Sequence, residues 1–182
     1  MHERVKAIFF FVIVGLVAGG FIWRQAQHTG DPGVINIGQK APDFSIKDES
    51  GKYVKLSDFR GKVVFLNFWG TWCASCVQEM PEIQKFYREF KDRKFELLEI
   101  SIDNDWPEIH QFYKDHHLDL PTYLDPGHQI ATKYKVYKFP ESFVIDANGN
   151  VVKHIWYWDP RLVAKVTDLV EQAEKGAEKG AD

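Results

Sequence analysis

The chain has 182 residues, of which 45% are hydrophobic and 27% are charged, and its formal net charge at pH 7 is −3. This balance gives no support for nucleic-acid binding, because the sequence has no cluster of basic residues. The length allows one well-buried domain, and two cysteines are too few for a disulfide scaffold.

The first feature along the chain is an uncharged apolar segment from Ala7 to Trp23. As a helix it would be about 25 Å long, which is at the short end for a membrane span. Arg4 and Lys6 precede it, so the positive-inside rule predicts a cytoplasmic N-terminus. We therefore expect residues 1–24 to be a signal anchor, a single-pass transmembrane helix in a bacterial cytoplasmic membrane. The rest of the chain would lie on the periplasmic or extracytoplasmic side.

A cleaved signal peptide is the alternative, because Ala18-Gly19-Gly20 offers small residues near the end of the apolar segment. We prefer the uncleaved anchor, since apolar residues resume and end at Trp23, a residue type that favours the membrane interface. Residues 25–35 contain glycine and proline without periodicity, which indicates a linker. A single domain is expected over residues 36–173.

This domain is predicted to begin with a β-hairpin. Ala41-Pro42-Asp43-Phe44 opens an extended segment, and Asp48 to Lys52 has the composition of a turn between two strand-like stretches. Ser57 can then cap a short helical turn that ends at Gly61.

Both cysteines stand at the junction of a predicted strand and a predicted helix. The apolar run from Val63 to Trp69 is typical of a strand that is buried on both faces. A helix should follow, because apolar residues recur at intervals of three and four positions as Ile83, Phe86, Tyr87 and Phe90. Cys73 falls in the first turn of this helix. There the unpaired N–H groups and the helix dipole stabilise the thiolate of Cys73 relative to the thiol.

Cys76 lies one helical turn after Cys73, near enough for a Cys73–Cys76 disulfide to form and break. The spacing suits dithiol exchange, in which Cys73 attacks a substrate disulfide and Cys76 then attacks Cys73 to release it. Zinc would need two further ligands at knuckle spacing, and haem attachment would need His at the position of Val77. A purely structural disulfide is also disfavoured, because the loop is too short to restrain the unfolded chain much.

The run Phe68-Trp69-Gly70-Thr71-Trp72-Cys73-Ala74-Ser75-Cys76, followed by Glu79-Met80-Pro81, resembles the active site of the thioredoxin superfamily. It is most similar to the membrane-anchored TlpA/ResA-like branch, which includes CcmG-like proteins. The resemblance implies an α/β thioredoxin-like fold with a central mixed β-sheet flanked by helices and an N-terminal β-hairpin extension. The hairpin region is also similar to peroxiredoxins. However, the Pro-x-x-x-Thr-x-x-Cys setting of their reactive cysteine is missing here.

The resemblance also assigns a role to Glu79. In ResA-like proteins the matching Glu lies near the cysteines, and a partly buried carboxylate could accept the proton that Cys76 must lose. The alternative is a solvated charge on the helix surface. Thioredoxin carries a buried Asp on the preceding strand where this chain has Asn67, and Asn cannot titrate, which strengthens Glu79 as the candidate.

The remaining elements follow from apolar periodicity and turn residues. Strands are predicted at 95–102, 121–124, 142–146 and 151–156, and helices at 107–117, at 129–134 and after Pro160. The closing residues 174–182 are predicted to be a disordered tail.

The segment around Pro140 is assigned by resemblance. In thioredoxin-like folds the matching proline is cis and packs against the cysteines, which leaves the backbone of Phe139 free to pair with an extended substrate. Pro140-Glu141 is similar to the Pro-Glu pair of the cytochrome c maturation members, although Glu141 could equally be a solvated strand residue. The predicted substrate-binding residues are Trp72, Phe139, Pro140 and Glu141. The predicted catalytic residues are Cys73, Cys76 and Glu79.

The sequence thus predicts an extracytoplasmic thiol-disulfide oxidoreductase with no cofactor and no metal. By resemblance it would reduce disulfides in exported proteins such as apocytochrome c, whose haem-binding Cys-x-x-Cys-His must be reduced before haem attachment. Its electrons would come from a membrane thiol reductase of the DsbD/CcdA type. Two alternatives stay open: a disulfide oxidase or isomerase of exported proteins, and a non-catalytic module that binds or chaperones partner thiols.

Overall fold

A computed structural model describes residues 35–179 of the chain. The predicted signal anchor, residues 1–24, lies outside the described residues, and so do nearly all of the predicted linker and residues 180–182. Within the described part, no helix is long and apolar enough to cross a membrane.

A five-stranded mixed sheet forms the centre of the domain. In spatial order its strands are β5 (Thr122–Leu124), β4 (Phe95–Ser101), β3 (Val63–Trp69), β6 (Glu141–Ile145) and β7 (Val151–Ile155). β3 pairs in parallel with β4, and β4 with β5, whereas β6 is antiparallel to both β3 and β7. Each strand lies where the sequence predicts one, and the central β3 is buried along its whole length.

The predicted N-terminal hairpin is present as a separate two-stranded sheet. It consists of β1 (Ser45–Lys47) and β2 (Tyr53–Lys55), which are antiparallel, and the 3-10 helix η1 (Leu56–Phe59) follows. An isolated bridge from Lys40 to Asn150 ties the segment before β1 to the start of β7.

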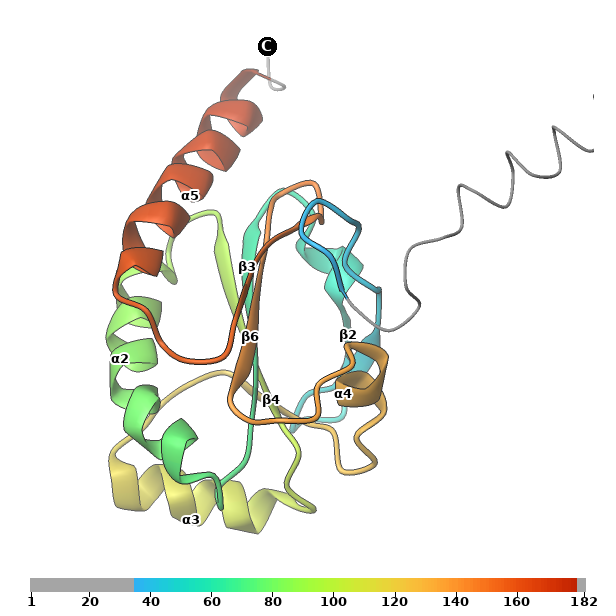
Figure 1. Cartoon of the computed structure of the whole chain (residues 1–182), viewed down its shortest axis with the longest axis vertical. Helices are drawn as coiled ribbons and strands as arrows, with labels where there is room; N and C mark the ends of the chain where they lie inside the picture. The colour runs from blue at the N-terminus through green and yellow to red at the C-terminus, as the bar shows by residue number, and fades with distance from the viewer. Residues whose placement is uncertain (1–34, 180–182) are drawn as a thin grey trace, which may run out of the picture. The chain divides into compact units, whose positions relative to one another are not determined.

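Helices cover the sheet on both faces (Figure 1). The helices α2 (Ala74–Phe90), α3 (Trp106–His116) and α5 (Arg161–Lys179) cover one face, and the hairpin and α4 (Gln129–Lys133) cover the other. We call these the helical face and the hairpin face. Side chains of β3 alternate between them, as the strand period requires, so that Phe65 packs on the helical face and Leu66 on the hairpin face. The architecture is the α/β thioredoxin-like fold that the sequence predicts.

Helix α5 corrects one expectation. The sequence predicts disorder from residue 174, but α5 continues to Lys179. Its first turns are anchored by buried Leu162, Val166 and Val170. Further along, both carboxylate oxygens of Glu174 accept hydrogen bonds from the Arg93 guanidinium, at 3.0 and 2.7 Å. A two-point ion pair to the loop before β4 therefore holds a segment whose composition alone favours disorder.

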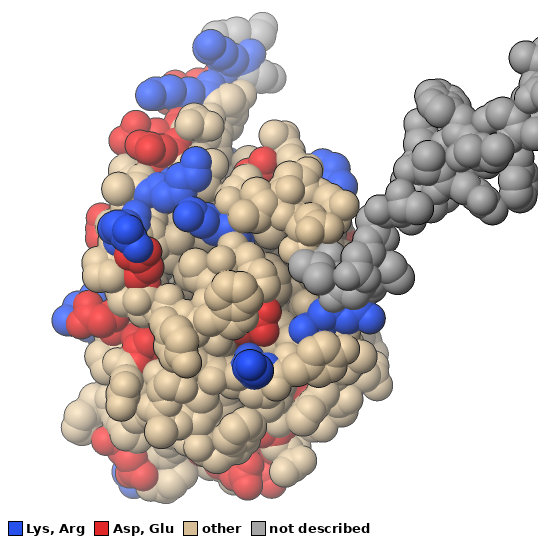
Figure 2. Space-filling model, viewed as in Figure 1, with Lys and Arg blue, Asp and Glu red and all other residues tan. Residues whose placement is uncertain are grey.

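The surface has no strong field of one sign on the face shown in Figure 2. Along α5, lysine and arginine side chains alternate with acidic ones, and the centre of this face carries few charged side chains. The exposed large hydrophobic residues of the described chain are Ile37, Tyr53, Trp72, Tyr137, Trp156 and Tyr157.

Candidate active site

The two cysteines lie where β3 ends and α2 begins. Cys73 is the N-cap residue of α2, one position earlier than the first-turn placement that the sequence predicts, and its Sγ accepts a hydrogen bond from the backbone N–H of Cys76 at 3.2 Å. The sulfur atoms are bonded at 2.16 Å, with the Cα atoms 5.2 Å apart. Cys73 is 6% exposed and Cys76 is fully buried. A substrate can therefore reach Cys73 first.

Trp72 and the Phe139–Pro140 segment border the disulfide. The Phe139–Pro140 peptide bond is cis, as the resemblance implies. The ring of Trp72, which is 64% exposed, meets the ring of Phe139 edge-on with centroids 5.8 Å apart. Ser75 Oγ links Phe139 to the disulfide: it lies 3.5 Å from Cys73 Sγ and donates to the carbonyl oxygen of Phe139, also at 3.5 Å. The structure thus brings two of the predicted substrate-binding residues, Trp72 and Phe139, close to Cys73, and the cis bond joins Pro140 to Phe139.

A buried carboxylate that the sequence did not single out fixes the loop before Cys73. Asp103 is 2% exposed, and it accepts hydrogen bonds from the backbone N–H of Thr71 at 3.0 and 3.2 Å and from the Thr71 hydroxyl at 2.8 Å. Ser101 Oγ donates to the same carboxylate at 2.7 Å. Charge-assisted bonds of this kind are the stronger ones in proteins, so Asp103 holds the turn that leads into the disulfide.

Glu79 points into the protein from α2 and is 7% exposed, so the alternative of a solvated helix charge is wrong. Its Oε2 accepts a hydrogen bond from the backbone N–H of Trp158 at 3.0 Å, and its Oε1 is buried without a hydrogen-bond partner among the described residues. Burial raises the pKa of Glu79 to about 7, against the lowering effect of the Trp158 bond. A carboxyl group with this proton affinity can both accept and return a proton near neutral pH.

Another buried carboxyl group, which the sequence does not predict, lies on β4. Glu99 is fully buried, and its Oε2 accepts a hydrogen bond of 2.8 Å from Asn67 Nδ2 on the adjacent strand β3. Asn67 Oδ1 in turn accepts from the Ser142 hydroxyl on β6 at 2.9 Å. Burial raises the pKa of Glu99 to about 8, and the charge of Glu79 raises it further while the Asn67 bond lowers it.

Glu141 is on the other side of the sheet. It shares the hairpin face with Phe143 because side chains alternate along β6, and it is 5% exposed, so it is not a solvated strand residue. Its carboxylate pairs with His154 Nε2 on β7, and the His154 ring stacks on Phe143 with centroids 4.5 Å apart. Burial raises the pKa of Glu141, and the His154 hydrogen bond opposes this. The structure therefore places Glu141 apart from Glu79, although it directly follows Pro140.

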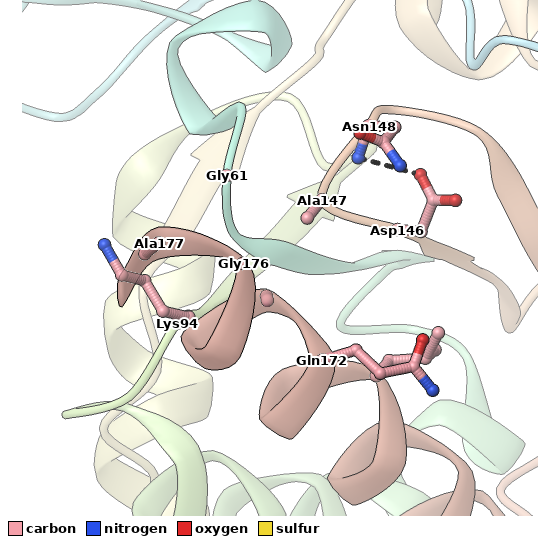
Figure 3. A pocket seen from close by; sticks show the side chains of 10 residues that line it. Gly61, Lys94, Asp146, Ala147, Asn148, Gln172, Gly176 and Ala177 are labelled. Carbon is pink, nitrogen blue, oxygen red and sulfur yellow. Dashed lines mark hydrogen bonds between the residues drawn. The ribbon is translucent and has the colours of Figure 1, made fainter. Parts of the chain in front are cut away.

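A cleft of about 500 Å³ lies far from the cysteines, between α5 and the turn that joins β6 to β7 (Figure 3). It is lined by Gly61 and Lys94, which precede β3 and β4, so it opens at the opposite end of the sheet from the disulfide. The Asp146 carboxylate in its wall accepts bonds from the backbone N–H groups of Asn148 and Asn150 at 3.0 and 2.8 Å. None of the predicted site residues lines this cleft.

Comparison with known proteins places the chain in a family. The model of the AhpC/TSA family matches residues 37–154, which include the hairpin, both cysteines and the cis-proline segment. The chain belongs to the AhpC/TSA family.

Within this family the chain is similar to thiol-disulfide oxidoreductases named ResA. It is 37% identical over 155 residues to ResA of Bacillus thuringiensis subsp. konkukian, covering 84% of this chain and 89% of the relative. It is 39% identical over 142 residues to ResA of Bacillus subtilis, covering 78% of this chain and 79% of the relative.

Solved structures agree with these matches. A putative thiol:disulfide interchange protein DsbE from Chlorobium tepidum has a TM-score of 0.66 at 30% identity, covering 76% of this chain and 98% of that one. A putative protein disulfide isomerase from Bacteroides thetaiotaomicron has a TM-score of 0.71 at 32% identity, covering 79% and 96%. The predicted enzyme class is confirmed: the chain is a thiol-disulfide oxidoreductase of the ResA/DsbE type.

Proposed function

We propose that this enzyme works outside the cytoplasm as a reductant of disulfides in exported proteins, with apocytochrome c as its principal substrate. The observation that carries the proposal is the unequal exposure of the two bonded sulfurs at the start of α2. Cys73 is partly accessible beside the exposed Trp72, whereas Cys76 is enclosed. One sulfur is therefore positioned to capture a substrate, and the other to release it.

The reaction follows from this arrangement. In the reduced enzyme the Cys73 thiolate attacks a substrate disulfide, which forms a mixed disulfide and expels the first substrate sulfur as a thiolate. The Cys76 thiol passes its proton to the Glu79 carboxylate and attacks Cys73 Sγ. This step closes the Cys73–Cys76 disulfide and expels the second substrate sulfur. The substrate gains two electrons and, with protons from solvent and Glu79, becomes a dithiol.

Substrate recognition is proposed to involve the border of the disulfide. An extended substrate segment would pair with the backbone of Phe139 and pack against the exposed ring of Trp72. Pro140 would hold this segment next to the sulfurs. Glu141 would contribute to substrate binding from the hairpin face, where the pair with His154 fixes the orientation of its carboxylate.

The electron supply and the location are proposed together. Each turnover leaves the enzyme as a disulfide, so a reductant must restore the dithiol. A membrane thiol reductase of the DsbD/CcdA type fits this need if residues 1–24 anchor the chain in the cytoplasmic membrane with its domain on the outer side. The apolar segment and the positive charges before it support that orientation.

A trapping experiment tests the function. The reduced Cys76→Ser chain is mixed with an oxidised peptide that contains Cys-x-x-Cys-His, and the products are weighed by mass spectrometry. We expect a stable mixed disulfide on Cys73, because the resolving sulfur is gone, and no adduct with the Cys73→Ser control. Absence of an adduct in the Cys76→Ser chain would overturn the exchange mechanism. Equal capture of an oxidised peptide of the same length that lacks the haem-binding pattern would overturn the proposed substrate.

A further inference from the structure

Three buried polar atoms lack hydrogen-bond partners among residues 35–179. They are Trp69 Nε1, Glu79 Oε1 and Glu99 Oε1. All three side chains belong to the helical face: Trp69 packs in the same cluster as both cysteines, and Glu99 alternates along β4 with Leu97 of that cluster. Buried polar groups are nearly always satisfied, so three unsatisfied atoms on the face of the sheet that carries the disulfide call for a functional explanation.

The surroundings of Glu99 fix which of its oxygens can carry a proton. Oε2 is occupied as the acceptor of the Asn67 amide, whose own oxygen accepts from Ser142. This chain of bonds crosses β6, β3 and β4 and orients the carboxyl group from one side. Oε1 is left as the site for a proton, because a protonated oxygen has a much smaller cost of burial than one that shares a full negative charge.

Among residues 35–179, no basic side chain neutralises Glu99. The influences on the pKa of Glu99 are burial, the Asn67 bond and the charge of Glu79, and none of these comes from a basic side chain. From α2 the titratable group that reaches Glu99 is Glu79, and from α3 it is Tyr113, whose hydroxyl bonds to Thr122 on β5. Burial and the charge of Glu99 raise the pKa of Tyr113, so this phenol stays neutral and supplies no counter-charge.

We propose that Glu99 is the proton-holding partner of Glu79, and that the two buried carboxyl groups carry at most one negative charge between them at neutral pH while Cys76 cycles between thiol and disulfide. The proposal rests on the proposed function, in which Glu79 receives the Cys76 proton. Glu99 acts through Glu79 and is therefore a positioning residue of the site.

Glu99 keeps a further negative charge away from Cys76 while the mixed disulfide is resolved. Before resolution, Glu79 is ionised, and Glu99 and the Cys76 thiol are neutral. Proton transfer moves the negative charge to the Cys76 sulfur, and attack on Cys73 moves it to the departing substrate thiolate. Glu99 keeps its proton throughout, so Glu79, Glu99 and Cys76 never carry two negative charges at once, and the Asp103 carboxylate remains bonded to Thr71 and Ser101. A second buried charge would oppose formation of the Cys76 thiolate.

The test is an infrared titration of protonated carboxyl groups in the full oxidised chain. In the wild type, Glu79 and Glu99 should each lose a buried carboxyl proton, near pH values of about 7 and about 8, apart from any step of Glu141 on the other side of the sheet. In Glu99→Gln, which keeps an oxygen to accept the Asn67 bond, the upper titration step should be absent and the lower step should remain. Glu79→Gln should keep the Glu99 step but move it down by about one pH unit, because a like charge has been removed. Glu96→Gln on the same strand is the control and should retain both steps.

The proposal is overturned if Glu99→Gln retains both steps, or if Glu79→Gln leaves the upper step unmoved. The Glu79→Gln chain leaves Glu99 in place, so the test stands even if Glu99→Gln fails to fold. A kinetic measurement separates a role of Glu99 in proton transfer from a role in packing. In Glu99→Gln, the rate of mixed-disulfide resolution should no longer show an inflection at alkaline pH, a change that a loss of packing would not cause. If the Cys76→Ser chain captures no peptide, the exchange chemistry is overturned. If it captures the peptide but the titrations of Glu79 and Glu99 do not affect each other, only the role of Glu99 is overturned.

Discussion

Replacing Glu79 with Gln should make the oxidised protein more stable at alkaline pH and remove a pH dependence that burial of this carboxyl group creates. The pKa of Glu79 is raised from 4.5 to about 7, chiefly by burial. Between these two values the folded state holds a proton that the unfolded state has lost. The contribution of Glu79 to the unfolding free energy therefore falls as pH rises through this window. It is complete only below the pKa that Glu79 has in the unfolded chain.

The magnitude follows from the size of the shift. A rise from 4.5 to about 7 corresponds to about 3 kcal/mol at roughly 1.4 kcal/mol per pH unit. No discount for solvent is needed, since Glu79 is only 7% exposed. Gln offers an oxygen that can still accept the Trp158 N–H, so the substitution removes the charge and keeps the hydrogen bond. The difference in unfolding free energy between Glu79→Gln and wild type should rise by about 3 kcal/mol from pH 4 to pH 8.

Urea unfolding of the disulfide form, followed by tryptophan fluorescence at several pH values, measures this difference. Glu89→Gln on the same helix is a suitable control, because Glu89 is exposed and its removal should leave the pH dependence of wild type unchanged. A Glu79→Gln minus wild-type difference that stays constant within about 1 kcal/mol across the range would refute the reasoning. In that case the pKa of Glu79 would not be raised in the folded protein in solution.

Three further outcomes are expected. Asp103→Ala should lower the unfolding free energy by about 2–4 kcal/mol, because it removes the acceptor of the Thr71 and Ser101 bonds; Asp103→Asn, which keeps one oxygen, should lose less, and equal losses would contradict this role. Trp72→Ala should slow reaction with a peptide disulfide more than reaction with oxidised glutathione, since Trp72 is 64% exposed beside Cys73, whereas Tyr53→Ala, equally exposed on the hairpin, should leave this ratio unchanged. Glu174→Gln should speed hydrogen exchange in the last turn of α5 more than Glu171→Gln does, because Glu174 bonds Arg93 at 2.7 Å and Glu171 reaches Lys175 at only 3.8 Å; equal exchange in the two variants would show that the ion pair does not hold the end of α5.

The strand, the helix and the disulfide at their junction could be predicted because their signals are local. The apolar run of β3 marks a strand buried on both faces, and the period of α2 marks its buried side. Cys73 and Cys76 are close because of spacing within one helix. The role of Glu79 could be predicted as well, because helix geometry and the family resemblance together place it near the cysteines.

Glu99 could not be predicted in the same way. In sequence it stands in a strand where an acidic residue normally faces solvent, and its burial depends on parallel pairing with Asn67, which lies 32 positions earlier. Asp103 was missed for a similar reason, because its partner Thr71 is also 32 positions away. The sequence reveals such residues only after the register between β3 and β4 is known.

The order at the end of α5 was mispredicted because composition was the only guide there. The segment is rich in Glu, Lys, Gly and Ala, which favours disorder in isolation. Its helix is held by Arg93, a residue far away in the chain. A contact of this kind outweighs local propensity, and it is not visible in the sequence.

Alkylation of the reduced protein tests the central claim most directly, namely that Cys73 at the tip of α2 is the attacking sulfur and Cys76 is the enclosed one. The reduced chain is treated with a limiting amount of iodoacetamide at pH 7, and the labelled residue and its rate are determined by mass spectrometry. We expect the label on Cys73, at a rate above that of free cysteine, with Cys76 labelled far more slowly. Labelling of Cys76 first, or reaction of Cys73 no faster than free cysteine, would contradict this mechanism.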